Sequence, residues 1–427
     1  MNFLMQNVEM PLIPVVAELE ANGYLIDCNH FTALRAYLEP EQAVVLEEIQ
    51  EIAGQEFNPN SSQQVAKLLY GDLGLPVSKK TEGGSPSTDE ESLGSLLDEN
   101  RVVGKILEHK KIAKIISTYC SFPDEVDDDS RLRPKYDQMG AITGRFSATK
   151  KIHTLPRNRK DHYGIRNGFI APAGFKIVGA DFDQQELFVL ASVSGDKAML
   201  DAIANGIDLH GLAAKRVFGL DCEPNEVGKL HPDKRKQVKE VQFGIFYGSG
   251  AQSLAKTLSL SLQAAEDLID GYFKTFPGVK SFINKTHNFA IKNGWLVDVF
   301  GRRRFIPDAQ RTKKSEFGLL GAALREAQNF PIQGAAATIT KLAMIQCHKH
   351  IREAHPRIKM ILSLHDELQF EVPDDEVEHF ASELPALMTD LGVESFGFKT
   401  PFKVSVKSGQ SWGTMVSRKP ANPGIAQ

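Results

Sequence analysis

The sequence predicts an α+β protein in which two helical lobes flank a sheet assembled from distant parts of the chain. Helical periodicity dominates residues 31–120 and returns from about residue 185 to 348. Short apolar stretches typical of strands lie at 175–182, 360–373 and 401–409. Strands and helices thus occur in separate runs along the chain, which favours the α+β class.

The first helical lobe is expected before residue 120. Residues 12–21 predict a short helix, which the segment GYLID follows. Three longer periodic stretches then span 31–53, 61–74 and 99–120, with a Gly/Ser/Pro-rich loop between the last two.

The strands and the second lobe come later. FKIVGADF (175–182) predicts a buried strand, and QQELFVLASVSG after it predicts a helix. The helical region that follows is expected to break at GSGA, FPGV and FGRRRFIPD. MILSLHDELQFEVP (360–373) is patterned as a β-hairpin, but its tip carries His365, Asp366 and Glu367 where Asn-Gly would make an easier turn.

Composition is that of a globular protein with more than one lobe. Of 427 residues, 42% are hydrophobic and 24% are charged. The four cysteines lie far apart, which favours reduced thiols in the cytosol over disulfides or a zinc site. No apolar run approaches the roughly 20 residues of a membrane span, and no signal peptide is visible. We therefore expect a cytoplasmic protein with no membrane partner.

Charge is unevenly distributed although the net charge is only −4. Residues 145–166 carry seven Lys/Arg against Asp161, and residues 301–314 carry six against Asp308. Local basic tracts on an acidic protein fit a groove that binds a polyanion. Such tracts are also common on solvated faces, and this alternative stays open.

Two aspartates lie at the ends of predicted strands. Asp181 closes IVGAD, and Asp366 lies at the hairpin tip. If one sheet brings them together, the two carboxylates repel each other unless cations lie between them. A pair of Mg²⁺ ions roughly 3.5–4 Å apart is typical of in-line displacement at phosphorus. The alternative is that each aspartate only makes local hydrogen bonds in a turn.

A helical stripe gives a sharper signal. In DKRKQVKEVQFGIFYGSG, Arg235, Lys239, Phe243 and Tyr247 recur every four residues, which places them on one helix face. Two cations followed by two aromatics suit a ligand with a polyphosphate at one end and a flat base at the other. The alternative is an amphipathic helix with Phe243 in a core.

Weaker candidates accompany these motifs. His210 lies near the start of a predicted helix, where it can meet a phosphate, although a lone histidine is more often an ordinary polar residue. Arg145 lies in a turn-rich segment that suits a groove contact or an exposed loop. Asn329 and Gln333 lie near a proline break, where amides can reach base edges or sugars.

These pieces occur together, in this order, in the polymerase region of family A DNA polymerases, the DNA polymerase I family, which the chain resembles from about residue 9 to Trp412. DFDQQELFVLASVSGD is similar to the family's first palm motif, and LHDELQFE to its last. RKQVKEVQFGIFYG matches the fingers-helix pattern R-x₃-K-x₃-F-G-x₂-Y-G at every defining position. Shorter matches surround Arg145, Arg166, His210, Arg325, Asn329 and Gln333.

The resemblance implies a right-hand polymerase with an antiparallel-sheet palm and a helical thumb and fingers. The implied division is palm 1–38, thumb 39–130, palm with the first metal-binding motif 131–195, fingers 196–320, and palm with the second metal-binding motif 321–427.

The resemblance also implies the site. Asp181, Asp366 and Lys239 are the implied catalytic residues. Asp181, Asp366 and the Phe182 carbonyl are expected to hold two Mg²⁺ ions, for which Mn²⁺ substitutes. The dNTP is expected to contact Arg235, Lys239, His210, Phe243, Tyr247, Glu186 and Gln184. The DNA is expected to contact Arg145, Arg166, Gln333, Asn329, Arg325 and His365.

The implied activity is template-directed DNA synthesis, in which dNMPs are added to a primer 3′ end by two-metal-ion phosphoryl transfer. Lys239 is expected to protonate the leaving pyrophosphate, and Glu186 to screen the sugar 2′-position. Several positions depart from the family pattern but remove no metal ligand, so an active enzyme with shifted fidelity or template tolerance is expected. These are Asp183, Gln185, Phe188, His153, Thr154, Gln242 and Thr338.

The polymerase-like region begins within the first ten or so residues, so we expect an enzyme without its own proofreading exonuclease domain. Two alternatives stay open, a free-standing minimal polymerase and a piece of a larger or split protein. The expected partners are primer–template DNA, dNTPs, and a separate exonuclease or replisome proteins, around a monomer in a bacterial or phage-infected cell. Three other classes of protein fit the sequence less well. A metal-dependent phosphohydrolase carries its His-Asp dyad on a helix among further histidines, whereas the dyad here lies in a strand–turn–strand pattern. A catalytically dead DNA-binding protein would not need the intact motifs. A single-subunit RNA polymerase is disfavoured because Glu186 disfavours ribonucleotides.

Overall fold

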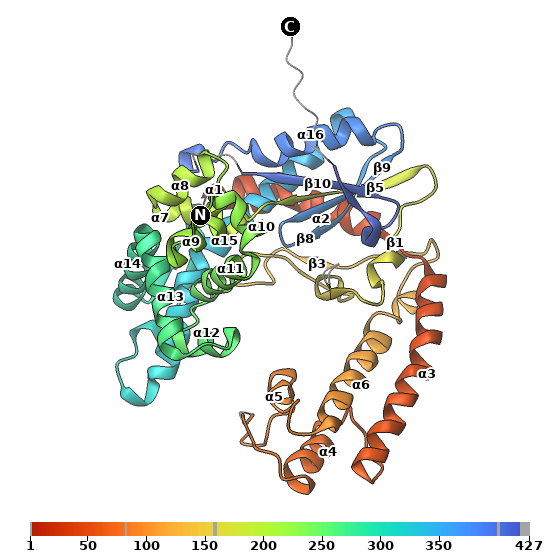
Figure 1. The fold of residues 1–427 in the computed structure, drawn as a ribbon. Helices are drawn as coiled ribbons and strands as arrows, with labels where there is room; N and C mark the ends of the chain where they lie inside the picture. The colour runs from red at the N-terminus through yellow and green to blue at the C-terminus, as the bar shows by residue number, and fades with distance from the viewer. Residues whose placement is uncertain (1, 82, 157–159, 399–401, 419–427) are drawn as a thin grey trace.

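The computed structural model describes residues 2–81, 83–156, 160–398 and 402–418. Its centre is a five-stranded antiparallel sheet with the strand order β11-β10-β5-β9-β8 (Figure 1). These strands are β5 (Phe175–Phe182), β8 (Lys359–Leu364), β9 (Glu367–Pro373), β10 (Val404–Gly409) and β11 (Val416–Ser417). The sheet therefore joins distant parts of the chain, and the predicted α+β class is confirmed.

The two faces of the sheet belong to two different hydrophobic cores. Along β5, Ile177 packs into a core shared with the first helical lobe. Val178, Ala180 and Phe182, which point to the opposite face, pack into a larger core shared with α16 and the second lobe. Because side chains alternate along a strand, Asp181 lies on the same face as Ile177, toward the first lobe.

The first helical lobe consists of α3 to α6 and projects away from the sheet in Figure 1. Its long helices, α3 (Cys28–Ala53) and α6 (Arg101–Thr118), pack against each other. Both begin where the sequence supplies a capping side chain, because Asp27 accepts a hydrogen bond from the His30 N–H and Asn100 accepts one from the Val102 N–H. The loop left between the predicted helices contains a short additional helix. The smaller helices are α4 (Ser62–Ala66) and α5 (Glu90–Gly94).

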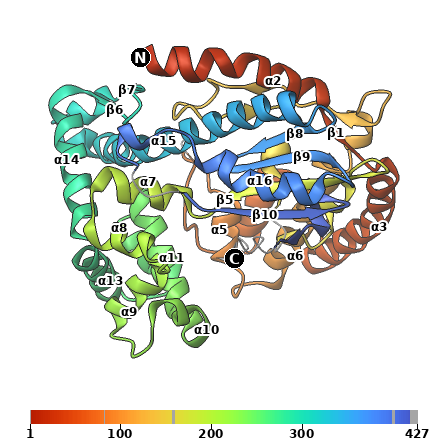
Figure 2. The same ribbon diagram turned by 90° about the horizontal axis from the view of Figure 1, so that it is seen from above.

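The second helical lobe gathers at one end of the sheet, while α16 lies over the strands (Figure 2). Its helices are α7 (Gln185–Ser194), α8 (Lys197–Ala204), α9 (Leu209–Phe218), α10 (Val227–Leu230), α11 (Pro232–Phe246), α12 (Ala251–Leu258), α13 (Leu262–Thr275) and α14 (Pro277–Asn293). The remaining elements are α1 (Asn2–Leu4), α2 (Met10–Asn22), α15 (Phe317–Ala354), α16 (Val377–Thr389), and the strand pairs β1 (Tyr24–Leu25) with β2 (Arg131–Leu132), β3 (Tyr136–Asp137) with β4 (Ser147–Ala148) and β6 (Trp295–Val297) with β7 (Arg303–Phe305).

The breaks predicted in the second lobe are confirmed in part. The helices are interrupted at FGRRRFIPD as expected, and its Arg303–Phe305 segment also pairs with Trp295–Val297 in a hairpin. The proline break predicted near Pro331 is wrong, because α15 continues through this residue and is 38 residues long. Pro331 and most residues beside it are buried, so packing against neighbouring helices offsets the lost backbone hydrogen bond. Among the described residues, we find no helix whose length and apolar character suit passage across a bilayer.

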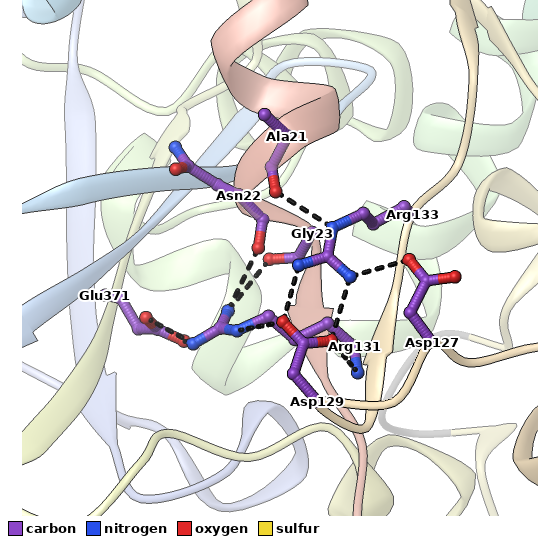
Figure 3. A network of polar contacts seen from close by, with 8 residues as sticks. All are labelled: Ala21, Asn22, Gly23, Asp127, Asp129, Arg131, Arg133 and Glu371. Atoms are coloured by element: carbon purple, nitrogen blue, oxygen red, sulfur yellow. Dashed lines mark hydrogen bonds and ion pairs between the residues drawn. The ribbon is translucent and has the colours of Figure 1, made fainter.

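An arginine-centred network fixes the end of α2 to the loop that leaves the first lobe (Figure 3). Arg131 donates to the carbonyls of Asn22 and Gly23 at 3.2 Å and pairs with Glu371 on β9 at 2.9 Å. The Glu371 side chain is only 2% exposed. Arg133 binds Asp127 and Asp129, whose carboxylates are largely exposed.

Arg131→Ala is therefore expected to destabilise the protein by about 3 kcal/mol, because it leaves the Glu371 carboxylate buried without its cation. Arg133→Ala removes ion pairs with two carboxylates that stay solvated, and it is the matched control, with an expected loss of about 1 kcal/mol or less. Urea unfolding followed by circular dichroism measures both. Equal losses in the two variants would contradict the assigned role of Arg131.

Candidate active site

The two predicted metal-binding aspartates meet at the edge of the central sheet. Asp181, the penultimate residue of β5, lies opposite Glu367 on β9. The next backbone N–H, that of Phe182, donates to the Asp366 carbonyl at 3.2 Å. Asp366 follows His365 in the two-residue turn between β8 and β9, and His365 has a φ of 58°. The hairpin was predicted correctly, and its tip holds a non-glycine residue in the left-handed region.

Three carboxylates, those of Asp181, Asp366 and Glu367, lie close together at this edge of the sheet. Burial, followed by the nearby Asp366 and Glu367 carboxylates, raises the pKa of Asp181 to about 8. Burial also raises the pKa of Glu367, against the opposing effect of a hydrogen bond from Gln369. A site that raises the pKa of a carboxylic acid in this way is stabilised by any cation placed between the carboxylates.

The donor set fits a hard divalent cation. Carboxylate oxygens of Asp181 and Asp366, with the nearby Phe182 carbonyl, are the oxygen ligands that Mg²⁺ and Mn²⁺ prefer. The high pKa of Asp181 supports this fit, because neighbouring carboxylates without a counter-charge repel each other.

Two buried hydrogen bonds in series hold the Glu367 side chain, and they were not predicted from the sequence. The Gln369 amide donates to a Glu367 oxygen at 2.5 Å, and the Tyr24 hydroxyl donates to the Gln369 amide oxygen at 2.7 Å. Arg166 belongs to the same region, because its charge lowers the pKa of Glu367. Its guanidinium is buried 4.2 Å from the centre of the Trp412 ring and donates to the Pro156 carbonyl. This placement favours internal support over the DNA contact predicted for Arg166.

Three residues of the predicted stripe, Arg235, Lys239 and Phe243, lie on α11. Arg235 is engaged by Asp208, with nitrogen–oxygen distances of 2.5 and 3.1 Å. Lys239 Nζ lies 5.8 Å from the centre of the Phe243 ring. Tyr247 follows the helix and is half-exposed. Sequence reasoning missed Asp208, although an aspartate just before the Leu209 helix start is a recognisable capping signal.

His210 faces this stripe but is not a surface cation. Its ring centre lies 6.3 Å from that of Phe243, and the residue is 2% exposed. Burial lowers the pKa of His210 to about 4, with Asp208 opposing and Arg235 and Lys239 adding to the effect. His210 is thus neutral at pH 7, so it can offer an N–H to a phosphate but no charge.

Glu186 and Arg145 form an ion pair next to the aspartates. Burial raises the pKa of Glu186 in spite of Arg145, and Asp366 adds to the increase. Gln184, which precedes α7, is exposed and has a φ of 55°. The sequence predicted Glu186 and Arg145 separately, one toward the dNTP and one toward DNA, and the structure shows that they hold each other.

The predicted DNA-contacting residues of α15 share one face. Arg325, Asn329 and Gln333 are four residues apart, with Arg325 exposed and the two amides half-buried. One turn further along, the same face borders a small cavity that also contains the predicted His365. Its lining residues are Gly144, Arg145, Phe146, His153, Ala337, Thr340, Lys341, Ser363 and His365.

Several departures from the family pattern have structural partners. Gln185 is buried and donates to the Thr340 hydroxyl at 3.1 Å. Phe188 stacks on Phe402, with ring centres 5.8 Å apart. Asp183 accepts a hydrogen bond from the Ser405 hydroxyl at 2.7 Å, so this additional carboxylate is engaged within the sheet.

Several arginines of the two basic tracts are paired with carboxylates and are therefore less available to bind a polyanion than the composition indicates. In 301–314, Arg302 is buried against Glu9, and Arg304 and Arg311 are paired with carboxylates. These pairs favour structural roles over a free cationic groove. In 145–166, Arg157 and Arg159 lie outside the described residues.

The chain is similar in sequence to known DNA polymerases over most of its length. Residues 28–414 match the model of the family described as DNA polymerase family A. The chain belongs to DNA polymerase family A. It is 35% identical over 413 residues to DNA polymerase I of Caldicellulosiruptor bescii, covering 96% of this chain and 47% of that protein. It is 34% identical over 414 residues to the thermostable DNA polymerase I of Thermus aquaticus, covering 96% of this chain and 48% of the relative.

A solved structure is similar to this chain in both fold and sequence. The POL domain of Pol1 from M. smegmatis, in complex with DNA primer–template and dNTP, matches with a TM-score of 0.88 and 30% identity, over 96% of this chain and 71% of that one. The chain spans about half the length of the curated relatives it matches. The predicted palm, thumb and fingers boundaries stay a prediction, and the boundary at 38/39 falls inside α3.

Proposed function

We propose that this chain catalyses template-directed DNA synthesis, adding dNMPs to a primer 3′ end. The observation that carries the proposal is the meeting of Asp181 and Asp366 at one sheet edge, in a fold that also presents Arg235, Lys239 and Phe243 on a single helix face. The similar POL domain, whose structure contains primer–template and dNTP, supports the assignment of these ligands.

The carboxylates of Asp181 and Asp366, with the Phe182 carbonyl, would hold two Mg²⁺ ions, and Mn²⁺ would substitute. Bound there, the cations would supply charge neutralisation and a lower pKa for the attacking hydroxyl. Glu367 adds negative potential beside the two aspartates, but it is not assigned as a metal ligand.

The helix α11 would bind the nucleotide along its length. Arg235 would fork onto phosphate oxygens, and Lys239 would hold the triphosphate and give its proton to the leaving pyrophosphate. Neutral His210 would donate an N–H to the same phosphates. Phe243 and Tyr247 would stack against the incoming base and the templating position.

The primer and template would lie along the remaining predicted residues. Arg145, His365 and the amide Gln333 are assigned to the primer terminus, with Asn329 and Arg325 further along α15. Gln184 and Glu186 are assigned to the sugar side of the nucleotide. Because Arg145 holds Glu186, these two parts of the site are expected to respond together to substitution at either position.

Primer extension assayed in the presence and in the absence of a DNA template tests the proposal. Synthesis that needs both primer and template supports it, whereas release of phosphate from dNTPs without template would favour a phosphohydrolase. The absence of a proofreading exonuclease, the monomeric state, the further protein partners and the cytoplasmic location stay predictions, and degradation of a labelled primer measures the first of them.

Glu186→Ala is expected to raise incorporation of ribonucleotides relative to deoxyribonucleotides by about 10–100-fold, because it removes the side chain assigned to screen the sugar 2′-position. Single-nucleotide incorporation of a dNTP and its rNTP counterpart measures the ratio. Arg145→Ala keeps Glu186 but removes its ion pair. Because Arg145 is also assigned to the primer terminus, the ratio of rNTP to dNTP incorporation is compared between the two variants, and not the absolute rate. Unchanged sugar discrimination in Glu186→Ala would remove Glu186 from this role.

A further inference from the structure

A cluster of histidines and glutamates joins the end of α15 to α16, away from the proposed active site. His350 lies in the last turns of α15, His355 follows that helix, and Glu383 lies on α16. The α16 side chains Phe380 and Leu384 share a core with Val178 and Phe370. That core covers the sheet face opposite to Asp181, so the cluster is separate from the catalytic carboxylates.

Three ligand atoms converge in this cluster. Glu383 Oε2 lies 3.2 Å from His350 Nε2 and 3.0 Å from His355 Nε2. One ligand atom from each of the three residues lies within 4.8 Å of the others. A tetrahedral zinc ion with bonds of about 2.0–2.2 Å holds its ligands roughly 3.3–3.5 Å apart, so small side-chain rotations close the set.

The surroundings orient His355 as a zinc-binding histidine is oriented in other proteins. The other nitrogen of His355, Nδ1, lies 2.7 Å from Glu376 Oε2, and the Glu376 carboxylate is itself paired with Arg357 at 2.6 Å. A carboxylate on Nδ1 fixes the tautomer in which Nε2 offers its lone pair toward Glu383 and His350. His355 is buried and its ring packs 5.6 Å from Phe380, which fixes the ring plane.

From this geometry we propose that His350, His355 and Glu383 bind a zinc-type divalent transition metal that ties α15 to α16. Two imidazoles and a carboxylate suit Zn²⁺ over Mg²⁺, which prefers oxygen ligands. A fourth position is open to water or to the exposed His379, whose Nε2 lies 3.6 Å from the other Glu383 oxygen. The sequence-based expectation of no zinc site rested on the spacing of the four cysteines alone, and the proposed site contains no cysteine.

The experiment uses the full chain, stripped with a chelator and kept in excess Mg²⁺ so that the catalytic carboxylates are already occupied. Calorimetric titration with Zn²⁺ is expected to show one site per chain. Saturation to about a hundredfold above the dissociation constant is expected to raise the melting temperature by about 3–5 °C. Visible absorption of bound Co²⁺ reports whether the coordination is tetrahedral.

His350→Gln and Glu383→Gln are expected to lose both the binding and the thermal shift. Both side chains are half-buried, so the variants test ligation with little loss of packing. His348→Gln is the matched control, because His348 lies on the same helix but pairs with Glu18. Binding that survives in His350→Gln and Glu383→Gln would overturn the proposal. So would a wild-type protein without a zinc-dependent shift, since the contacts of His355 with Glu376 and Glu383 would then hold the two helices without a metal.

Discussion

Replacing Asp366 with alanine is expected to reduce primer extension by at least about a thousandfold. Asp366 supplies one of the two carboxylates that would hold the cations, and loss of several kcal/mol of charge stabilisation in the transition state corresponds to a factor of this size. DNA binding is expected to persist, because the substitution leaves the neighbouring His365 in place and the other assigned DNA contacts lie on α15 and around Arg145. Single-turnover extension and fluorescence anisotropy with labelled primer–template measure the two quantities.

Asp374→Ala is the matched control for this variant. Asp374 follows the same hairpin at its opposite end and is exposed. Its substitution is expected to leave extension within about twofold of wild type, as is usual for surface positions away from a site. Substantial synthesis by Asp366→Ala, in a protein that binds DNA normally, would remove Asp366 from the catalytic centre.

Lys239→Ala is expected to slow incorporation by about a hundredfold or more. The substitution removes both a charge beside the triphosphate and the assigned proton donor to pyrophosphate, and positioned general acids contribute about 10²–10⁴-fold. Lys239→Arg separates the two effects, because arginine keeps the charge but gives up its proton far less readily. We expect Lys239→Arg to retain nucleotide KM while kcat stays low.

Lys236→Ala provides the comparison on the same helix, since Lys236 is exposed on α11. Pre-steady-state incorporation of a single dNMP gives the rate and the nucleotide affinity for all three variants. If Lys239→Arg restores the wild-type rate, Lys239 acts through its charge alone and the proton-donor role is wrong.

Features set by neighbouring residues could be predicted from the sequence. The stripe on α11 follows from a spacing of four residues, and the hairpin follows from alternation around His365 and Asp366. A strand that ends in Asp181 is also a local pattern. These features needed no knowledge of the rest of the chain, and the structure places them as expected.

Features set by distant residues could not be predicted in the same way. Tyr24 and Gln369, which support Glu367, are 345 residues apart in the sequence. The salt bridge between Arg235 and Asp208 and the burial of Arg166 against Trp412 likewise depend on tertiary contacts. The continuous helix through Pro331 shows the same effect on secondary structure, because packing there outweighs a local preference.

Single-nucleotide incorporation opposite each of the four template bases, with Mg²⁺ titrated from zero, tests the central claim most directly. The claim is that Asp181 and Asp366 act with the α11 stripe as one template-directed polymerase site. It predicts that only the complementary dNMP is added efficiently, that no addition occurs without a divalent cation, and that Asp366→Ala abolishes the reaction. Addition that ignores the template base, or that continues without a divalent cation, would contradict it.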